Sequence, residues 1–284
     1  MSATLRQSAV HDLDRLRARH SDVFTVDWRR RTMLLATIAL ALVLAGYAFY
    51  RLDFSLERLG SGLGTIAHMV SLMFPPSPGH RLPLYLLAMG ETLAIALLGT
   101  LTAAVLAFPV GFLAAKNVVP NIFAHFAVRR VLDVFRGVDV LIWALIFINV
   151  VGLGPFAGIL AIAASDFGSF GKLFSEAVET ADRKPIDGVI SAGGSRLHAL
   201  RFALIPEVFP VIASQVLYYF ESNTRSATIV GAGGIGLHLA EQIRILEWDV
   251  VAFLVLMILV AVAAIDWLSS RLRFAIIGRT RVAM

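Results

Sequence analysis

Long apolar runs separated by short polar segments make up most of the chain. They cover residues 33–50, 84–106, 138–151, 156–174, 207–230 and 250–268. Most of them hold about 18 or more residues with few charges, which is the length that a helix needs to cross a hydrocarbon core of about 30 Å. Inside lipid each backbone N–H and C=O must be paired within its own segment, so these runs predict helices. The pattern predicts an all-α polytopic membrane protein with about six transmembrane helices.

The polar segments between these runs predict the remaining organisation. Residues 51–83 contain several glycines and the PPSPG turn of residues 75–79, which indicate an external loop with room for one amphipathic helix. Residues 116–136 read as a basic loop before the third span. We therefore expect a cytoplasmic N-terminal segment at 1–32, a first transmembrane helix at 33–50, the external loop at 51–83, a membrane core at 84–270 and a cytoplasmic tail at 271–284.

Lysine and arginine are distributed unevenly among these segments. Twenty of the 25 lie in residues 1–32, 116–136, 172–205 and 271–281, which six spans place on one side of the membrane, and the opposite side receives five. Loops rich in Lys and Arg stay in the cytoplasm. We therefore expect both termini, and the polar stretch 187–206, to be cytoplasmic.

Composition supports a membrane protein and excludes other classes. The 284 residues are 58% hydrophobic and 16% charged, whereas soluble domains average about 45–50% apolar and about 25% charged residues. Without cysteine the chain has no disulfide or thiolate metal site. The first apolar run begins at Met33 behind a charged segment, which argues against a removable signal peptide. The net charge of +5 indicates contact with lipid head groups rather than with nucleic acid.

Residues 187–206, DGVISAGGSRLHALRFALIP, form the least membrane-like long stretch in the second half of the chain. Gly193 and Gly194 indicate a flexible or tightly packed corner, and leucines recur after it at helical spacing with basic residues between them. The stretch predicts a short amphipathic helix with a hinge in front, closed by Pro206. From the pattern alone it is either a surface connector or a docking element for another protein.

Motifs for nucleotide binding or catalysis lack the context that they require. Residues 231–236 spell G-x-G-x-x-G, but they lie between two predicted spans instead of after a buried strand, so we interpret them as a compact hairpin between closely packed helices. Phosphate-loop, H-E-x-x-H and G-x-S-x-G strings do not occur, and the histidines are scattered. The sequence therefore predicts no catalytic residue, no bound cofactor and no metal ligand in this chain.

Polar side chains in or beside the spans are the other candidates for function, because a charge inside a membrane is costly unless it is paired or used. They are Glu91, Asn149, Asp166, Glu221, Asn223, Arg225 and Asp266. Glu221 and Arg225 lie four residues apart, which suits a local ion pair. Alternatively, Arg225 lines an anion path. The possible path residues are Glu221, Ser222, Asn223, Thr224, Arg225 and Ser226.

The stretch 187–206 resembles the cytoplasmic loop of ATP-binding-cassette (ABC) importer permeases. Asp187 stands at the usual Glu position, Gly193 and Ser195 match, and Pro206 closes the motif thirteen residues after Gly193. Other strings are similar to the phosphonate permease subfamily over about residues 84–270; they are ETLAIALLGT (91–100), FPVGFLAAKN (108–117), WALIFINVVGLGPFAGILA (143–161), GKLFSEAVE (171–179) and VGAGGIG (230–236). Val138-Asp139 stands where this subfamily usually has Pro-Glu.

The resemblance implies a type I ABC importer permease fold, with residues 84–270 as the permease core. It implies a homodimer in the inner membrane, two ATPase subunits that hold ATP and magnesium, and an external binding protein that delivers a phosphonate, phosphite or phosphate. The residues that would couple to the ATPase are Asp187, Gly193, Gly194, Ser195, Arg196, His198, Arg201 and Pro206. The alternative is a secondary transporter driven by an ion gradient, which would favour internal repeats that the sequence does not display.

Overall fold

A computed structural model of the chain describes residues 28–52, 55–229 and 233–281. Within these ranges the regular structure is entirely helical, as the apolar runs predict. The chain divides into two compact units, residues 1–68 and 69–284, and each is described by itself. The predicted segment 1–32 lies mostly outside the described residues.

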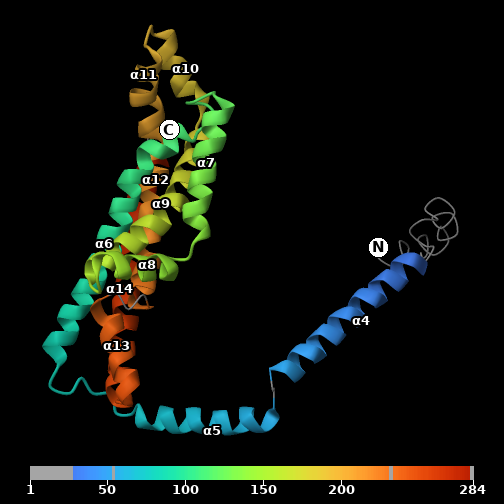
Figure 1. The fold of residues 1–284 in the computed structure, drawn as a ribbon. Helices are drawn as coiled ribbons and strands as arrows, with labels where there is room; N and C mark the ends of the chain where they lie inside the picture. Colours follow the sequence, from blue (N-terminus) through green and yellow to red (C-terminus); the bar gives the residue numbers. More distant parts are fainter. Residues whose placement is uncertain (1–27, 53–54, 230–232, 282–284) are drawn as a thin grey trace, which may run out of the picture. The chain divides into compact units, whose positions relative to one another are not determined.

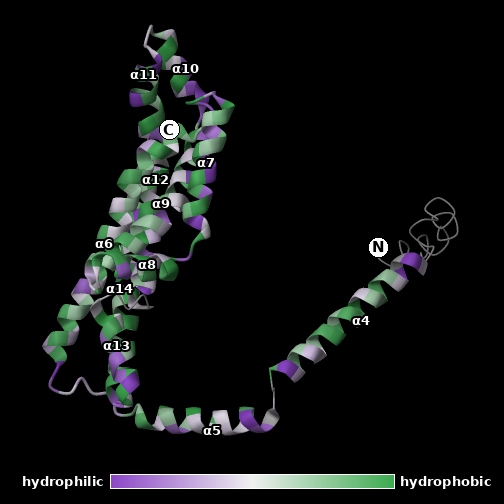
Figure 2. Cartoon of the chain, in the orientation of Figure 1, coloured by the Kyte–Doolittle hydropathy of each residue, from purple (hydrophilic) through white to green (hydrophobic). Residues whose placement is uncertain are grey.

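The first unit contains the predicted first transmembrane helix. Helix α4 (Trp28–Arg51) has 24 residues, and its apolar side chains face outward all round. Figure 2 shows the hydrophobic colouring along most of its length. A helix that is apolar on every face suits lipid. Helix α5 (Leu56–Leu72), which begins in this unit, is the helix expected within residues 51–83.

The second unit is built on four long helices, α6 (Leu82–Leu113), α9 (Pro155–Thr180), α12 (Ile205–Ile229) and α14 (Trp248–Arg281). Together with α4 they supply the five helices that, in the described part of the chain, are long and apolar enough to cross a membrane. Three of them are longer than predicted, and α9 continues to Thr180, six residues beyond the predicted end. Helix α6 runs through Pro109 to Leu113, and α14 includes residues 271–281 of the expected tail. The short helix α13 (Gly234–Ile245) follows the glycine segment.

The third predicted span, residues 138–151, contains one short helix that bends sharply away from the helix before it. Helix α7 (Ile122–Gly137) and helix α8 (Val140–Val151) meet at an angle of 86°, and they make a sixth span only as a pair. Twelve residues of α8 measure about 18 Å, well short of a bilayer core of about 30 Å. The expectation of a basic loop over residues 116–136 is wrong for most of that range, because residues 122–137 form α7, which buries Leu132 and turns Arg129 toward Glu179 on α9.

A polar cap fixes this break. The Asp139 carboxylate accepts a hydrogen bond from the backbone N–H of Leu141 at 2.8 Å, so it caps the N-terminus of α8. The chain therefore bends at Val138-Asp139 although the proline usual in the phosphonate permease subfamily is absent.

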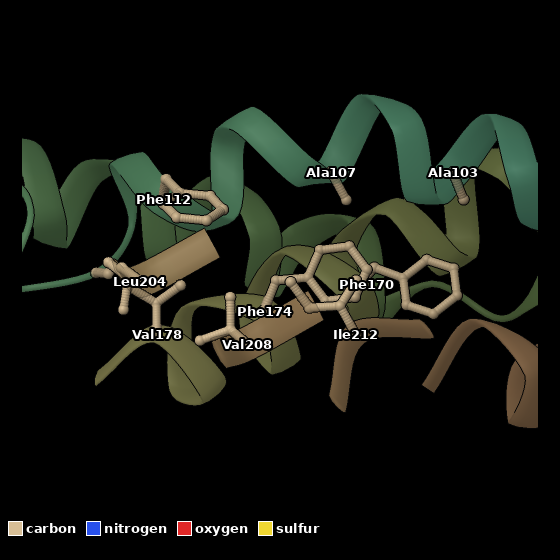
Figure 3. Packing of buried hydrophobic residues seen from close by; sticks show 10 residues of the cluster. Ala103, Ala107, Phe112, Phe170, Phe174, Val178, Leu204, Val208 and Ile212 are labelled. Atoms are coloured by element: carbon tan, nitrogen blue, oxygen red, sulfur yellow. The ribbon is translucent and has the colours of Figure 1, made fainter. Parts of the chain in front are cut away.

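Small residues on α6 bring α9 and α12 close (Figure 3). Ala103, Ala107 and Gly111 recur every four residues on one face, opposite the rings of Phe170 and Phe174 on α9. A Cβ on Gly111 would lie 2.7 Å from the Cβ of Phe174. Small side chains at such a contact let helix backbones approach, which is how membrane helices gain packing energy without a hydrophobic driving force. This core holds the two candidate sites at fixed positions.

Candidate functional site

A tight turn follows helix α10 (Arg183–Ser191) at the predicted corner. Gly193 has φ +85°, and the N–H of Gly194 donates to the carbonyl of Val189 at 2.9 Å, which satisfies an orphan carbonyl at the helix end. A Cβ on Gly194 would lie 2.7 Å from that carbonyl oxygen. Of the two interpretations open from the sequence, the corner is the tightly packed one.

The next residues form a reciprocal cap. Ser195 precedes helix α11 (Arg196–Ala199); its hydroxyl accepts from the N–H of His198 at 3.4 Å, and the His198 Nδ1 accepts from the N–H of Ser195 at 3.3 Å. This arrangement is a capping box in which histidine takes the usual place of glutamate or glutamine. Two of the predicted coupling residues therefore hold each other in position.

The prediction that Pro206 closes a separate short helix is wrong. Helix α11 continues through a π-helical turn, η1 (Leu200–Leu204), directly into α12, and Pro206 is the second residue of α12. In the π turn the N–H of Ile205 donates to the carbonyl of Leu200, five residues back instead of four. This change in hydrogen bonding comes just before Pro206, which has no N–H to donate. The segment is thus joined to a membrane helix without a break, as a helical run of residues 196–228.

Helices α10 and α11 form one end of the second unit (Figure 1), and apolar side chains there are exposed. Leu197 is 77% exposed and Phe202 is 62% exposed, whereas Ala199, Ala203 and Leu204 face inward. The predicted coupling residues Asp187, Arg196, His198 and Arg201 are also exposed. We call the exposed residues of 187–202 the docking surface. Large apolar groups among cations are typical of surfaces that bind another protein.

Two carboxylates make three contacts near the docking surface that the sequence pattern did not reveal. The Glu207 carboxylate on α12 accepts from the N–H of Asp182 at 2.6 Å, immediately before α10. The Glu179 carboxylate on α9 accepts from Arg129 on α7 and from the N–H of Lys116, both at 2.9 Å. These partners are 25 to 63 residues apart in sequence, so no local pattern indicates them.

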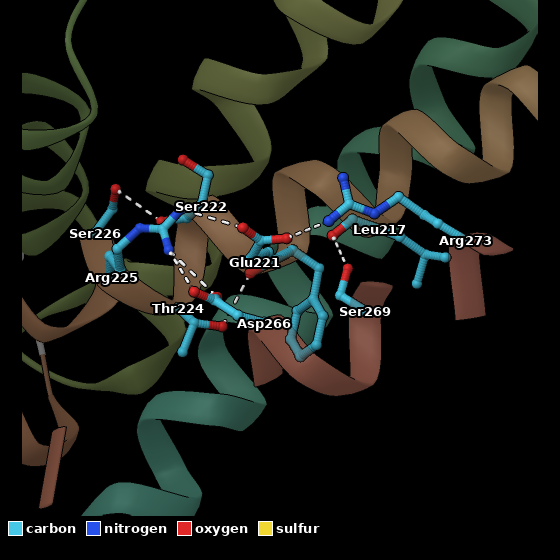
Figure 4. Close-up of polar contacts among 10 residues, drawn as sticks. Leu217, Glu221, Ser222, Thr224, Arg225, Ser226, Asp266, Ser269 and Arg273 are labelled. Atoms are coloured by element: carbon cyan, nitrogen blue, oxygen red, sulfur yellow. Dashed lines mark hydrogen bonds and ion pairs between the residues drawn. The ribbon is translucent and has the colours of Figure 1, made fainter. Parts of the chain in front are cut away.

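The second candidate site is an ion network between α12 and α14 (Figure 4). Arg225 lies 3.6 Å from Glu221 and 3.3 Å from Asp266, and Glu221 also pairs with Arg273 at 2.6 Å. The local pair expected from the spacing of four is therefore present, but both of its members also reach α14. The sequence analysis did not name Arg273 as a candidate, although this residue lies seven positions after Asp266 and therefore on the same helix face.

The ion network is not buried in the monomer. The side chains of Arg225 and Asp266 are 46% and 41% exposed, on helices that are otherwise apolar enough to span a membrane. A charge at such a position is tolerated where it meets water or another protein rather than lipid. Ser222 and Ser226 lie beside Arg225 on the same helix (Figure 4), and the Ser226 hydroxyl donates to the backbone of Ser222.

The other two predicted path residues lie within the helix packing. Asn223 is 7% exposed, and its amide donates to Asp166 on α9 at 2.5 Å and to Thr100 on α6 at 2.9 Å. Thr224 is 1% exposed and donates to the carbonyl of Phe220. The six predicted residues are thus divided. Arg225 is exposed with its three partly buried neighbours beside it, whereas Asn223 and Thr224 are buried, and Asn223 joins α12 to α6 and α9.

Three strings of the sequence that lie far apart meet in space. The N–H of Gly234 donates to Glu91 at 3.2 Å, and the N–H of Ile235 donates to Thr92 at 2.8 Å, so two side chains of α6 cap α13. A Cβ on Gly233 would lie 3.1 Å from the nitrogen of Pro155 at the start of α9. The described glycines are close-packing positions, as we expected; residues 230–232 of this string lie outside the described residues.

A bundle of membrane-length helices with an exposed apolar and basic end and a charged group on its helices is that of a multi-pass membrane protein. Residues 107–281 match the family described as binding-protein-dependent transport system inner membrane component, and the chain belongs to this family. It is the permease subunit of an ABC importer, which implies partner ATPase subunits and a substrate-binding protein. The ion-gradient alternative is not favoured.

Two relatives cover almost the whole chain. The putative phosphite transport system permease protein HtxC of Stutzerimonas stutzeri is 39% identical over 258 residues, which are 90% of this chain and 91% of that protein. The phosphite transport system permease protein PtxC of the same organism is 34% identical and covers 88% and 91%. These proteins are transport permeases rather than enzymes.

The fold is also that of a solved ABC importer. A chain of the inward-facing MetNI methionine ABC transporter superposes with a TM-score of 0.62 at 19% identity, over 70% of this chain and 99% of that one. This similarity supports the predicted type I ABC importer permease fold.

Proposed function

We propose that this permease carries a phosphonate or a related oxyanion, phosphite or phosphate, into the cell across the inner membrane. The observation that carries this proposal is the 39% identity to a relative named for phosphite transport, over nine tenths of both chains. The phosphate-import permease protein PhnE of Mycolicibacterium smegmatis is 40% identical over 65% of this chain. ATP and magnesium belong to the partner ATPase subunits, and the chain itself needs no cofactor.

Two copies of the chain form the membrane part of this importer. The exposed ion network on α12 and α14 supports this arrangement, because charged side chains there need a partner copy or a water-filled path instead of lipid. Within the path Arg225, flanked by Ser222 and Ser226, meets the oxyanion. Its position between two carboxylates suits weak and reversible binding, which conduction requires.

The docking surface couples the path to the ATPase subunits. Leu197 and Phe202 fill an apolar groove of an ATPase subunit, and Arg196 and Arg201 meet acidic groups around it. Since α11 continues through η1 into α12, a rigid-body movement of the ATPase subunit is transmitted along α12 to Arg225. The segments 1–32 and 271–284 lie on the same side of the membrane as this surface.

Uptake and ATP hydrolysis by the complex with both partners, reconstituted in liposomes, test this proposal. Gly193→Pro cannot adopt φ +85° and loses a backbone hydrogen bond to Ile190, and Arg201→Glu reverses a charge of the docking surface. We expect both variants to reach the membrane and hydrolyse ATP while phosphite uptake falls by about 5- to 150-fold, the range of typical coupling energies. Gly90→Ala, at a helical position of α6 outside the docking surface and with open space around it, is the matched control.

Normal coupled uptake by both variants would contradict the proposal that the docking surface couples to the ATPase subunits.

The substrate class is tested in the same liposomes by competition. Methylphosphonate and phosphate should reduce phosphite uptake and sulfate should not, and inhibition by sulfate alone would contradict the proposed substrate.

A further inference from the structure

A cavity of about 200 Å³ lies at the end of the second unit opposite the docking surface. The turn before α6, the last residues of α13 and the first residues of α14 line it and leave it open to solvent on one side, and these elements gather at that end in Figure 1. A backbone hydrogen bond of 3.2 Å from Ser77 to Asp249 ties the turn to α14. A cavity of about 150 Å³ is enough for benzene, so this one admits a compact ligand of about seven non-hydrogen atoms.

Two buried polar side chains that line this cavity have no hydrogen-bond partner among the described residues. Gln242 is 4% exposed and Tyr85 is 1% exposed, yet neither the amide nor the hydroxyl donates to or accepts from another described group. The polar atoms of both side chains keep some solvent exposure, so they open into the cavity. The amide and the hydroxyl are thus free for a polar ligand in the cavity.

Unpaired charges of both signs line the same cavity. Arg81 and Glu247 form no ion pair with any residue in the described part of the chain, and the imidazole of His80 adds a further hydrogen-bonding group. A guanidinium is complementary to a tetrahedral oxyanion, and a carboxylate is complementary to an ammonium group. A ligand that satisfies both is a zwitterion.

We propose that this cavity binds an aminoalkyl phosphorus oxyanion, with its oxygens on Arg81 and His80 and its ammonium on Glu247. Gln242 and Tyr85 complete the hydrogen bonds of the oxyanion. That the oxyanion is one of phosphorus rests on the proposed function. The same chemistry has two sources, a free aminoalkylphosphonate and the phosphoethanolamine head group of a membrane lipid.

Binding is measured by ³¹P NMR titration of 2-aminoethylphosphonate onto the full-length chain in nanodiscs of phosphatidylcholine and phosphatidylglycerol. We expect saturable line broadening, with a dissociation constant that rises about tenfold in Arg81→Gln and in Gln242→Leu, the effect of losing one charge-assisted or buried hydrogen bond. Arg244→Gln, an exposed arginine on α13 that does not line the cavity, is the matched control.

Glu247→Gln separates this site from a general anion site. Methylphosphonate lacks the ammonium group, so the wild-type chain should prefer 2-aminoethylphosphonate, and Glu247→Gln should abolish the preference. Glu247 is exposed, so this variant tests the proposal even if Gln242→Leu fails to fold. No saturable binding by the wild-type chain, or an unchanged preference in Glu247→Gln, would overturn the inference.

Nanodiscs that contain phosphatidylethanolamine distinguish the two sources. If the head group occupies the cavity, this lipid blocks 2-aminoethylphosphonate and copurifies with the wild-type chain more than with Gln242→Leu. If the free compound is the ligand, its binding is unchanged. A chain that transports phosphite without binding at the cavity overturns only this inference, whereas binding at the cavity without oxyanion transport overturns the proposed function.

Discussion

Arg225 is held between two carboxylates at a place where the membrane helices expose charge. Glu221 is shared with Arg273 at 2.6 Å, whereas the contacts of Arg225 are longer, at 3.6 Å and 3.3 Å. Glu221 therefore stays paired if Arg225 turns toward another anion. Charge-assisted hydrogen bonds weaken with distance, so we expect Arg225 to be the member of the ion network that a passing oxyanion engages.

At the residue scale, Arg225→Gln tests this role. The substitution removes the cation but leaves Glu221 paired with Arg273, so the fold is retained. We expect phosphite uptake by the reconstituted complex to fall about 10- to 100-fold, the effect of about 1.4–2.8 kcal/mol of lost stabilisation along the path. Arg244→Gln on α13 is the matched control. Uptake that keeps its rate and its salt dependence in Arg225→Gln would assign the residue to ion pairing alone.

At the element scale, the spacing of the helices depends on glycines whose neighbours come from other helices. Gly168 on α9 faces the backbone of α7, and a Cβ there would lie 2.6 Å from the nitrogen of Arg136 and from the carbonyl oxygen of Leu132. Gly90 on α6 has open space around it. Two glycines of similar sequence context therefore have different structural roles.

Gly168→Ala should separate α7 from α9, because backbone atoms cannot move aside as a flexible side chain can. We expect a loss of about 1–3 kcal/mol in the free energy of unfolding, typical of overpacking. Gly90→Ala should instead stabilise the chain by up to about 1 kcal/mol, because alanine favours the helix. Unfolding in mixed micelles with increasing SDS measures both, and equal effects of the two substitutions would contradict this account of the packing.

The sequence predicted what depends on local pattern. The apolar runs indicated the long helices, and Gly193 indicated the corner after α10. The bend at Asp139 and the π turn before Pro206 were not predicted, because a helix can absorb a proline or break beside a capping residue according to its tertiary contacts. The junction of Asn223 with Asp166 and Thr100 spans 57 and 123 residues, a distance at which hydropathy carries no information.

At the scale of the whole molecule, the orientation of the chain in the membrane decides which partner each end of the second unit faces. Helices α10 and α11 lie at one end and α13 at the other (Figure 1). The excess of Lys and Arg predicts that residues 172–205 lie in the cytoplasm, where ATP is available, and that Arg244 lies outside. The docking surface then faces the ATPase subunits, and the cavity beside Gln242 faces the substrate-binding protein.

Single cysteines test this orientation directly, because the chain has none of its own. Ser191→Cys on α10 and Arg244→Cys on α13 replace exposed residues at the two ends. In intact cells whose outer membrane is permeabilised, we expect a membrane-impermeant maleimide to label only Arg244→Cys, and to label Ser191→Cys after the inner membrane is opened. Labelling in the reverse order would place the docking surface outside, away from ATP. This result would contradict the coupling proposal. It would also contradict the predicted cytoplasmic location of both termini, because six spans place residues 1–32, the docking surface and residues 271–284 on one side.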